Sequence, residues 1–189
     1  MNIDTTSKPP ALLLIDVQKA FDDPYWGKRN NPDAEKEMAR LLTHWRQQRW
    51  PVVHIQHCSV DPNSPLQPGL PGHAFKDEVA PIDGEAQFQK TVNSGFIGTE
   101  LEAHLKSRGL SDLVLVGLTT DHCVSTTTRM AGNLGFNVTL VSDATATFDR
   151  TGPDGVTHTA EALHQVHLAS LHGEFCAVVT ASELLSSLT

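Results

Sequence analysis

The segment of residues 113–130, LVLVGLTTDHCVSTTTRM, constrains the fold more than any other part of the sequence. Its first four residues form an unbroken apolar run that stops at Gly117, which is typical of a parallel strand buried on both faces. Apolar and small residues then recur at helical spacing from Val124 onward, so the periodicity changes from strand to helix. Cys123 lies at this change, just beyond the carboxyl end of the predicted strand.

The position of Cys123 indicates a reactive thiol. Open α/β sheets bind ligands beyond the carboxyl ends of their strands, where the next helices begin. A helix amino terminus offers free N–H groups and a positive dipole end, which favour a thiolate, and the same N–H groups can stabilise an oxyanion. The alternative is a buried structural cysteine, which is the more common role of a free thiol.

Strand and helix patterns alternate along the whole chain. Further strands are predicted at residues 11–15, 52–56, 86–90, 137–141 and 175–179. Further helices are predicted from Pro32 to about Trp45 and at residues 98–108, 156–171 and 181–188, with Val156, Ala160, Leu163 and His167 on the buried stripe of the helix at 156–171. This alternation predicts one domain over residues 1–189: a three-layer αβα fold whose six-stranded parallel sheet has the Rossmann-like order 3-2-1-4-5-6.

Residues 58–83 interrupt this alternation with prolines at five positions. Such a stretch is incompatible with regular structure, and a long loop inside a compact domain is more often functional than idle. We expect this loop to form a wall or a lid beside the site.

Composition excludes several classes of function. The formal charge of −8 and the absence of a Lys/Arg cluster argue against nucleic-acid and anionic-membrane partners. No targeting segment and no run of about 18 apolar residues occurs, so we expect a cytoplasmic protein with a small-molecule substrate. The three cysteines form no CxxC pair, which argues against a disulfide framework and against a structural zinc site.

Two further residues are candidate partners of the thiol. Asp16 ends the first predicted strand, which should neighbour the strand before Cys123 in a doubly wound sheet. Burial in an apolar wall would raise the proton affinity of this Asp, as a base requires. Lys90 ends the third predicted strand and is the candidate cation beside the thiolate, although a solvated surface lysine is the alternative.

The chain resembles the isochorismatase-like cysteine hydrolase family along essentially its full length, through several motifs that occur in the same order. They are LLLIDVQKAF, QKTVNSGFIGTELEAHL, VGLTTDHCVSTT, SDATATF and HLASLHGEF. The resemblance implies a triad of Asp16, Lys90 and Cys123, in which the thiol attacks a carbonyl carbon, Asp16 accepts and returns its proton, and Lys90 holds the charges in place. It also implies a cis peptide between Leu118 and Thr119, and an oxyanion hole made by the N–H groups of Thr119 and Cys123.

The resemblance also limits the reaction. Members of the family hydrolyse nicotinamide, ureidoacrylate and carbamoyl amides, or cleave the vinyl ether of isochorismate, and the vinyl ether enzymes do not need the thiol. Cys123 therefore favours hydrolysis of a C–N bond in a small amide, imide or ureido compound through a thioester, without a cofactor. The alternatives are a nicotinamidase-like metal-binding amidase, an isochorismatase-type vinyl ether hydrolase and a non-catalytic small-molecule-binding protein. By analogy with the family we expect a homo-oligomer.

The residues after the second strand depart from the nicotinamidase pattern. Nicotinamidases carry an Asp and two His metal ligands there, whereas His57 stands where the Asp is expected, so we predict no metal. An alternative metal site would use His54, His57 and His73, but side chains alternate between faces along a strand. The expected substrate-binding residues are Phe21, Gln56, His57, Asn93 and Phe96. We expect the histidines near the late helix, His158, His164, His167 and His172, to serve packing, and the role of His122 stays open.

Overall fold

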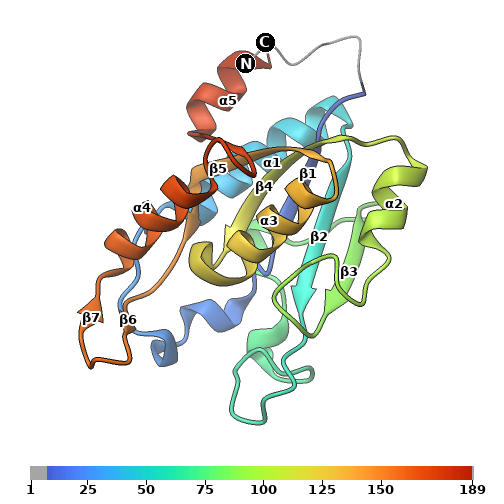
Figure 1. Ribbon diagram of the computed structural model, residues 1–189. Coiled ribbons are helices and arrows are strands. Elements are labelled where there is room, and N and C mark those ends of the chain that lie inside the picture. The colour runs from blue at the N-terminus through green and yellow to red at the C-terminus, as the bar shows by residue number, and fades with distance from the viewer. Residues whose placement is uncertain (1–7, 189) are drawn as a thin grey trace.

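A six-stranded parallel sheet forms the centre of the computed structural model, which describes residues 8–188 (Figure 1). The strands are β1 (Ala11–Ile15), β2 (Val52–His57), β3 (Ala86–Lys90), β4 (Asp112–Leu118), β5 (Asn137–Ala146) and β8 (Ala177–Val179). Their order is β3-β2-β1-β4-β5-β8, and every neighbouring pair is parallel. The predicted three-layer fold and its strand order are therefore confirmed, with β8 as the sixth strand of the sheet.

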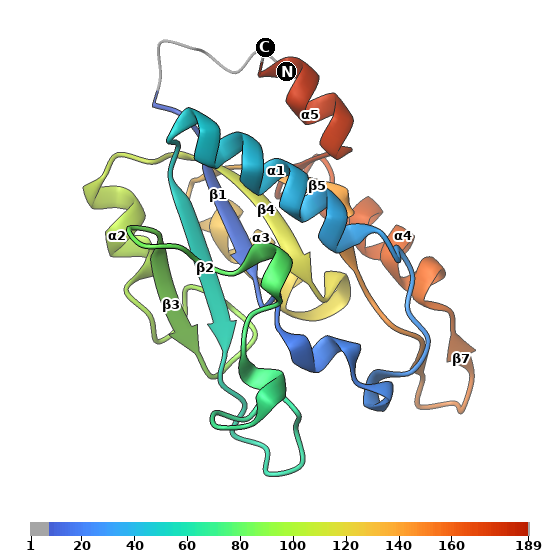
Figure 2. The same ribbon diagram turned by 180° about the vertical axis from the view of Figure 1, so that it is seen from behind.

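Helices cover both faces of the sheet because its central strands are apolar on both sides. In β1, Leu12 and Leu14 pack toward α1 (Ala34–Gln48) and α5 (Ala181–Ser187). Leu13 and Ile15 pack toward α2 (Leu101–Ser107), α3 (Ser125–Asn133) and α4 (Ala160–Leu171). Figures 1 and 2 show these two helical layers from opposite sides. In the described part of the chain, none of the helices has the length and apolar character needed to cross a membrane.

The region before α4 differs from the prediction. The chain forms a short hairpin of β6 (Arg150–Thr151) and β7 (Thr157–His158), and α4 begins only at Ala160, because the Thr159 side chain caps it by accepting a hydrogen bond from the main chain of Ala162. The predicted start at 156 is therefore wrong. Of the predicted stripe only Ala160 is buried, since Val156 is exposed in the turn and Leu163 and His167 are only half-buried. The buried positions of α4 are Ala160, His164, Leu168 and Leu171.

The chain is unusually constrained where β1 and β4 end side by side. Ile15 pairs with Gly117, and a Cβ atom at Gly117 would lie only 2.1 Å from the carbonyl oxygen of Ile15. Gly117 also has a φ of 129°, which L side chains rarely adopt. Asp16, the next residue after β1, has a left-handed φ of 52°, and the peptide bond between Leu118 and Thr119 is cis. The missing side chain at Gly117 therefore lets the two strand ends lie in close contact.

Candidate active site

Three strand ends bring Asp16, Lys90 and Cys123 together. Asp16 follows β1, Lys90 ends β3, and Cys123 lies in the π-helical turn η5 (Thr120–Val124) after β4, a type of turn that is frequent at functional sites. The Lys90 Nζ atom donates to Asp16 Oδ2 at 2.6 Å and to Cys123 Sγ at 3.3 Å. The side chains of Asp16 and Lys90 are completely buried, so this lysine is no solvated surface residue.

His57 is a fourth member of this cluster. Its Nδ1 atom lies 3.0 Å from Lys90 Nζ, and because an ammonium only donates, this nitrogen must be the acceptor and the ring proton lies on Nε2. Burial and the charge of Lys90 lower the pKa of His57 to about 4, so the ring is neutral near pH 7. The β2–β3 register pairs His57 with Lys90, and the Gln18 side chain holds the main chain of His57 through two hydrogen bonds.

The contacts of Lys90 leave its ammonium fully engaged. Its three N–H donors match three acceptors, which are the Asp16 carboxylate, the His57 ring and the Cys123 sulfur. The second oxygen of Asp16, Oδ1, has no hydrogen-bond partner within residues 8–188. The cluster therefore keeps one buried carboxylate oxygen available to accept a proton.

Protonation of the thiol depends on the carboxylate. Burial, and secondarily the negative charge of Asp16, raises the pKa of the Cys123 thiol far above its ordinary value, and burial also raises the pKa of Asp16, against the opposing effect of Lys90. The helix start is expected to favour a thiolate, and burial acts on Cys123 in the opposite direction. Burial thus disfavours the charged form of both side chains, and Lys90 is the cation that opposes it at each of them.

A cavity of about 200 Å³ opens above Cys123 at the carboxyl ends of the strands. It is lined by Phe21, Tyr25, Trp26, His57, Ser59, Asp61, Ser64, Leu66, Asn93, Thr119, His122 and Cys123. Of the residues expected to bind substrate, Phe21, His57 and Asn93 belong to this lining, as does Thr119 of the expected oxyanion hole. Asn93 Oδ1 lies 3.7 Å from the Cys123 sulfur.

Two expected pocket residues lie elsewhere. The Gln56 side chain donates to the carbonyl oxygen of His73, and the Phe96 ring stacks on Phe136 with centroids 5.8 Å apart. Neither residue lines the cavity. Gln56 connects β2 to the following loop, and Phe96 is part of the core beneath α3.

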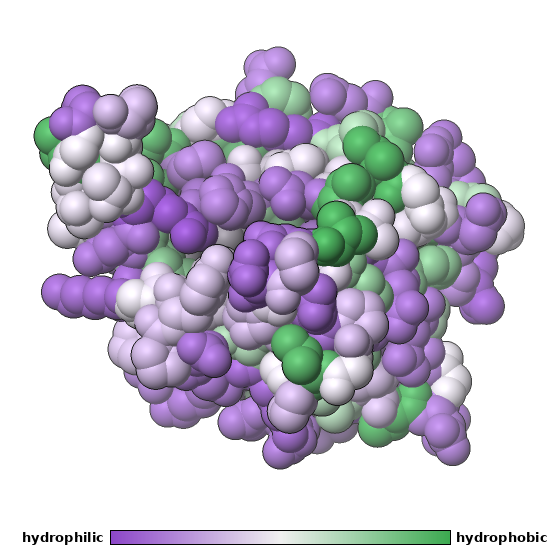
Figure 3. Space-filling model, turned by 90° about the horizontal axis from the view of Figure 1, so that it is seen from below, coloured by the Kyte–Doolittle hydropathy of each residue, from purple (hydrophilic) through white to green (hydrophobic). Residues whose placement is uncertain are grey.

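The walls of the cavity come from two loops. The predicted wall at 58–83 supplies Ser59, Asp61, Ser64 and Leu66. The segment that follows β1 supplies aromatic residues of the turns η1 (Lys19–Asp22) and η2 (Pro24–Trp26). Of these, only Phe21 was predicted from the sequence. The Phe21 and Trp26 ring centroids are 4.9 Å apart. Figure 3 views the face of the molecule at which the strands of the sheet end. It shows separate apolar groups in a mainly hydrophilic surface.

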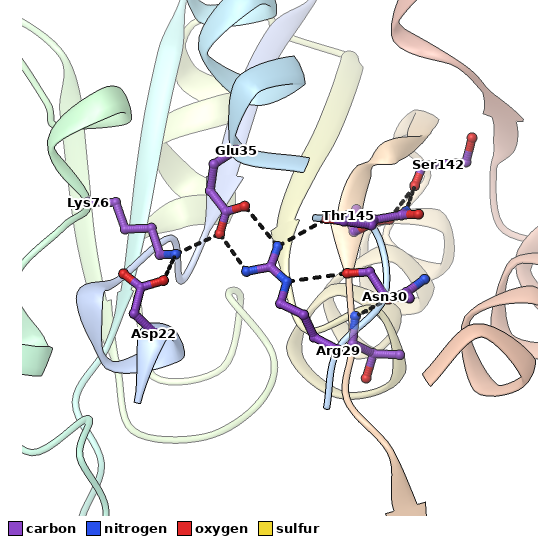
Figure 4. A network of polar contacts seen from close by, with 9 residues as sticks. Asp22, Arg29, Asn30, Glu35, Lys76, Ser142 and Thr145 are labelled. Atoms are coloured by element: carbon purple, nitrogen blue, oxygen red, sulfur yellow. Dashed lines mark hydrogen bonds and ion pairs between the residues drawn. The ribbon is translucent and has the colours of Figure 1, made fainter. Parts of the chain in front are cut away.

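Ion pairs hold both loops against α1 (Figure 4). Arg29 donates two hydrogen bonds of 2.8 Å to Glu35 near the start of α1, and Lys76 Nζ contacts both Asp22 and Glu35. Burial opposes ionisation of Glu35, but the hydrogen bonds and charges of Arg29 and Lys76 outweigh it and lower its pKa. Lys76 belongs to the loop at 58–83, and Arg29 belongs to the segment after β1. Because Glu35 contacts both side chains, it holds both walls against α1.

The histidines considered for a metal site make separate contacts. His54 Nε2 lies 2.8 Å from Glu85, and His73 Nε2 lies 3.2 Å from the Cys58 sulfur. Within residues 8–188, a group of possible ligand atoms within 4.8 Å of one another is formed by Asp16, His57 and Cys123. Lys90 Nζ already contacts all three of these side chains. An ammonium thus stands where a metal ion would bind, and this set does not fit a metal.

Two of the remaining histidines have distinct surroundings. His164 is buried in α4, where its Nδ1 atom lies 2.9 Å from Thr120 Oγ1 at the start of η5. It therefore packs in the core and supports the turn that carries Cys123. His122 lines the cavity. Its place beside Cys123 in the sequence did not decide whether it would reach the site.

Comparisons with known proteins find relatives of this chain in both sequence and structure. The family model described as "Isochorismatase domain" matches residues 10–183. The isochorismatase family protein YrdC of Bacillus subtilis, described as uncharacterized, is 48% identical over 176 residues, which is 93% of this chain and 94% of that protein. Streptothricin hydrolase of Streptomyces noursei is 34% identical over 155 residues, 80% of this chain and 55% of that protein. A crystal structure of a putative hydrolase of the isochorismatase family from Chromobacterium violaceum superposes with a TM-score of 0.94 at 48% identity, covering 100% of this chain and 97% of that one.

Proposed function

The chain belongs to the isochorismatase family of hydrolases, and we propose that it is a cysteine hydrolase that cleaves the C–N bond of a small amide, imide or ureido compound. Asp16, Lys90 and Cys123 act as its catalytic triad, without a metal. The observation that carries this proposal is the contact of the buried Lys90 ammonium with both the Asp16 carboxylate, at 2.6 Å, and the Cys123 sulfur, at 3.3 Å. A base and a cation beside a thiol are what a cysteine nucleophile requires.

The first half of the reaction forms a thioester. Cys123 Sγ attacks the substrate carbonyl carbon while its proton passes to Asp16, whose Oδ1 has no other partner within residues 8–188. The carbonyl oxygen becomes an oxyanion, which the N–H groups of Thr119 and Cys123 stabilise. Asp16 then gives the proton to the departing nitrogen, the C–N bond breaks, and ammonia or an amine leaves.

The second half of the reaction releases the acid. A water molecule attacks the thioester carbon while Asp16 again accepts a proton. The C–S bond breaks, the carboxylic acid departs and the proton returns to the sulfur. Lys90 keeps its charge throughout, so it stabilises whichever of Asp16 and Cys123 is negative. His57 accepts the remaining hydrogen bond of that ammonium and thereby fixes its direction.

Ammonia release tests this function. We would assay a panel of small amides, ureido acids and nicotinamide with the native protein, with Cys123→Ala, and with chelator. Cys176→Ala is the matched control, because Cys176 is a buried cysteine between α4 and β8, outside the cavity. We expect turnover that disappears only in Cys123→Ala and is indifferent to chelator. Turnover of nicotinamide that chelator abolishes would favour a nicotinamidase-like enzyme, and no turnover of any compound would favour a binding protein.

A further inference from the structure

The charged groups around the cavity are unevenly distributed, and this bears on the substrate of the proposed hydrolase. Among the described residues that line the cavity, Asp61 contributes a carboxylate and no Lys or Arg is present. Lys90 lies beneath the cavity and directs its three donors at Asp16, His57 and Cys123. A bound molecule therefore meets a carboxylate in the wall, with no cation of the protein directed at it.

The Asp61 carboxylate is not neutralised by its surroundings. Its Oδ1 atom accepts a hydrogen bond from the main-chain N–H of Asn63 at 2.9 Å, and its own N–H donates to Ser59 Oγ. The first contact holds the carboxylate, the second holds the main chain, and neither carries a positive charge. Asp61 itself is exposed. Within residues 8–188, the ion pairs of the protein do not include Asp61.

Aromatic rings form another part of the cavity wall. Tyr25 packs edge-on against Trp26 with ring centroids 5.1 Å apart, and Trp26 Nε1 donates to the carbonyl oxygen of Ala20, which fixes the indole. Both rings line the cavity together with Phe21. Trp26 also packs against Phe21 and Phe148, whereas Tyr25 is exposed. The faces of Tyr and Trp attract ammonium and guanidinium groups, so this wall, through Tyr25 above all, favours the same sign of charge as Asp61.

The two histidines of the cavity do not offset this preference near neutral pH. The pKa of His57 lies at about 4, mainly through burial. Burial also lowers the pKa of His122, and the neighbouring Arg150 acts in the same direction against Asp121. Both rings are therefore neutral and present no positive charge to a ligand.

We propose that the substrate of this site is a small amide that carries a cationic group, such as an organic ammonium, amidinium or guanidinium, held between Asp61 and the rings of Tyr25 and Trp26. Anionic substrates are disfavoured, because a carboxylate or phosphate would face Asp61 without a compensating cation. That the bound molecule is a substrate rests on the proposed hydrolase activity. The preference of the cavity for positive charge does not depend on that activity.

Thiosulfonate reagents test the selection of charge without requiring hydrolysis. The ethylammonium, methyl and ethylsulfonate methanethiosulfonates carry positive, zero and negative charge and convert Cys123 to a mixed disulfide with loss of methanesulfinate. The rate of modification of Cys123 would be followed by peptide mass mapping, which distinguishes it from modification of Cys58. Each rate would be divided by the rate at which the same reagent modifies 2-mercaptoethanol. If each unit of charge changes the rate about fivefold, the normalised ratio of cationic to anionic reagent is about 25.

Charge reversal at Asp61 is the decisive variant. We expect Asp61→Asn to bring the ratio close to one and Asp61→Lys to invert it. Asp83→Lys makes the same change in net charge in the turn before β3, beside a different surface hollow, and we expect it to leave the ratio unchanged. A ratio near one in the native protein, or a ratio that Asp61→Lys and Asp83→Lys change equally, would overturn the proposal.

Hydrolysis provides the second readout. Benzamide, 3-(aminomethyl)benzamide and 3-carboxybenzamide share one ring amide and differ in charge, and we expect kcat/KM to be highest for the cation and to reverse in Asp61→Lys. If the reagents select by charge but no amide is cleaved, the hydrolase proposal fails while charge selection stands. If amides are cleaved with equal kcat/KM whatever their charge, the inference fails and the hydrolase proposal stands.

Discussion

Replacing Lys90 by methionine removes the cation that stabilises the buried Asp16 carboxylate. Both side chains are completely buried, and Nζ lies 2.6 Å from Oδ2, so solvent does not screen the pair. Breaking a buried ion pair by removing one partner costs about 3–5 kcal/mol of unfolding free energy. The other oxygen of Asp16 has no hydrogen-bond partner within residues 8–188. We therefore expect Lys90→Met to lower the free energy of unfolding by an amount within this range at about pH 8.

The loss should depend on pH in a definite direction. Burial already raises the pKa of Asp16 against the effect of Lys90, and without that lysine the pKa rises further. A carboxyl group whose pKa is higher in the folded state binds more protons folded than unfolded, so its contribution to stability decreases as pH rises from the unfolded to the folded pKa. The penalty of Lys90→Met should therefore shrink when the pH is lowered from about 8 to about 5.

Urea unfolding followed by circular dichroism measures both effects. The matched control is Lys106→Met, since Lys106 forms an exposed ion pair with Glu102 at 2.6 Å and such pairs contribute roughly 0.5 kcal/mol. The double variant Asp16→Asn/Lys90→Met leaves no buried charge at this pair and should lose less stability than Lys90→Met alone. The reasoning is refuted if Lys90→Met costs no more than Lys106→Met, or if its penalty is the same at both pH values.

Asp16, Gly117 and Glu35 each carry a further prediction. The profile of kcat/KM against pH should have an acid limb above the ordinary Asp value of 3.8, since Asp16 must be ionised and burial raises its pKa; an acid limb below that value would contradict Asp16 as the base. Gly117→Ala should yield little soluble protein on expression, because its Cβ would lie 2.1 Å from the Ile15 carbonyl oxygen, whereas normal yield and melting temperature would contradict this constraint. Glu35→Gln should destabilise by about 1.5–3 kcal/mol at pH 7. Because Arg29 and Lys76 lower the pKa of Glu35, this deficit should disappear as pH falls through the ordinary and then the lowered pKa of Glu35, and a urea-unfolding deficit that persists in acid would refute the assignment.

Much of the fold follows from local patterns in the sequence. The apolar runs of β1 and β4 have no polar face, so they had to lie in the middle of a parallel sheet, and β1 and β3 begin and end where the pattern predicts. The start of α4 could not be obtained in this way. Val156 fits a helical stripe, but the Thr159 cap and the β6–β7 hairpin decide where that helix begins.

The site was predictable as far as strand ends determine it. Asp16, Lys90 and Cys123 end or follow strands that the predicted order makes close, so their proximity follows from topology. The contact between His57 and Lys90 required the β2–β3 register, which composition does not reveal. The protonation of Cys123 depends on how deeply the thiol is buried and on its distance from a carboxylate, and both are properties of packing. The aromatic wall and Asp61 come from loops, whose paths carry little periodic signal.

Trapping the thioester tests the central claim most directly. An amide that the protein hydrolyses would be mixed with it, and the reaction would be quenched in acid at short times. The products would be analysed by intact mass and by peptide mapping, with Cys123→Ala as the comparison. We predict a transient mass increase equal to the acyl group on the peptide that contains Cys123, absent from Cys123→Ala and removed by hydroxylamine. Undiminished turnover by Cys123→Ala would contradict the account.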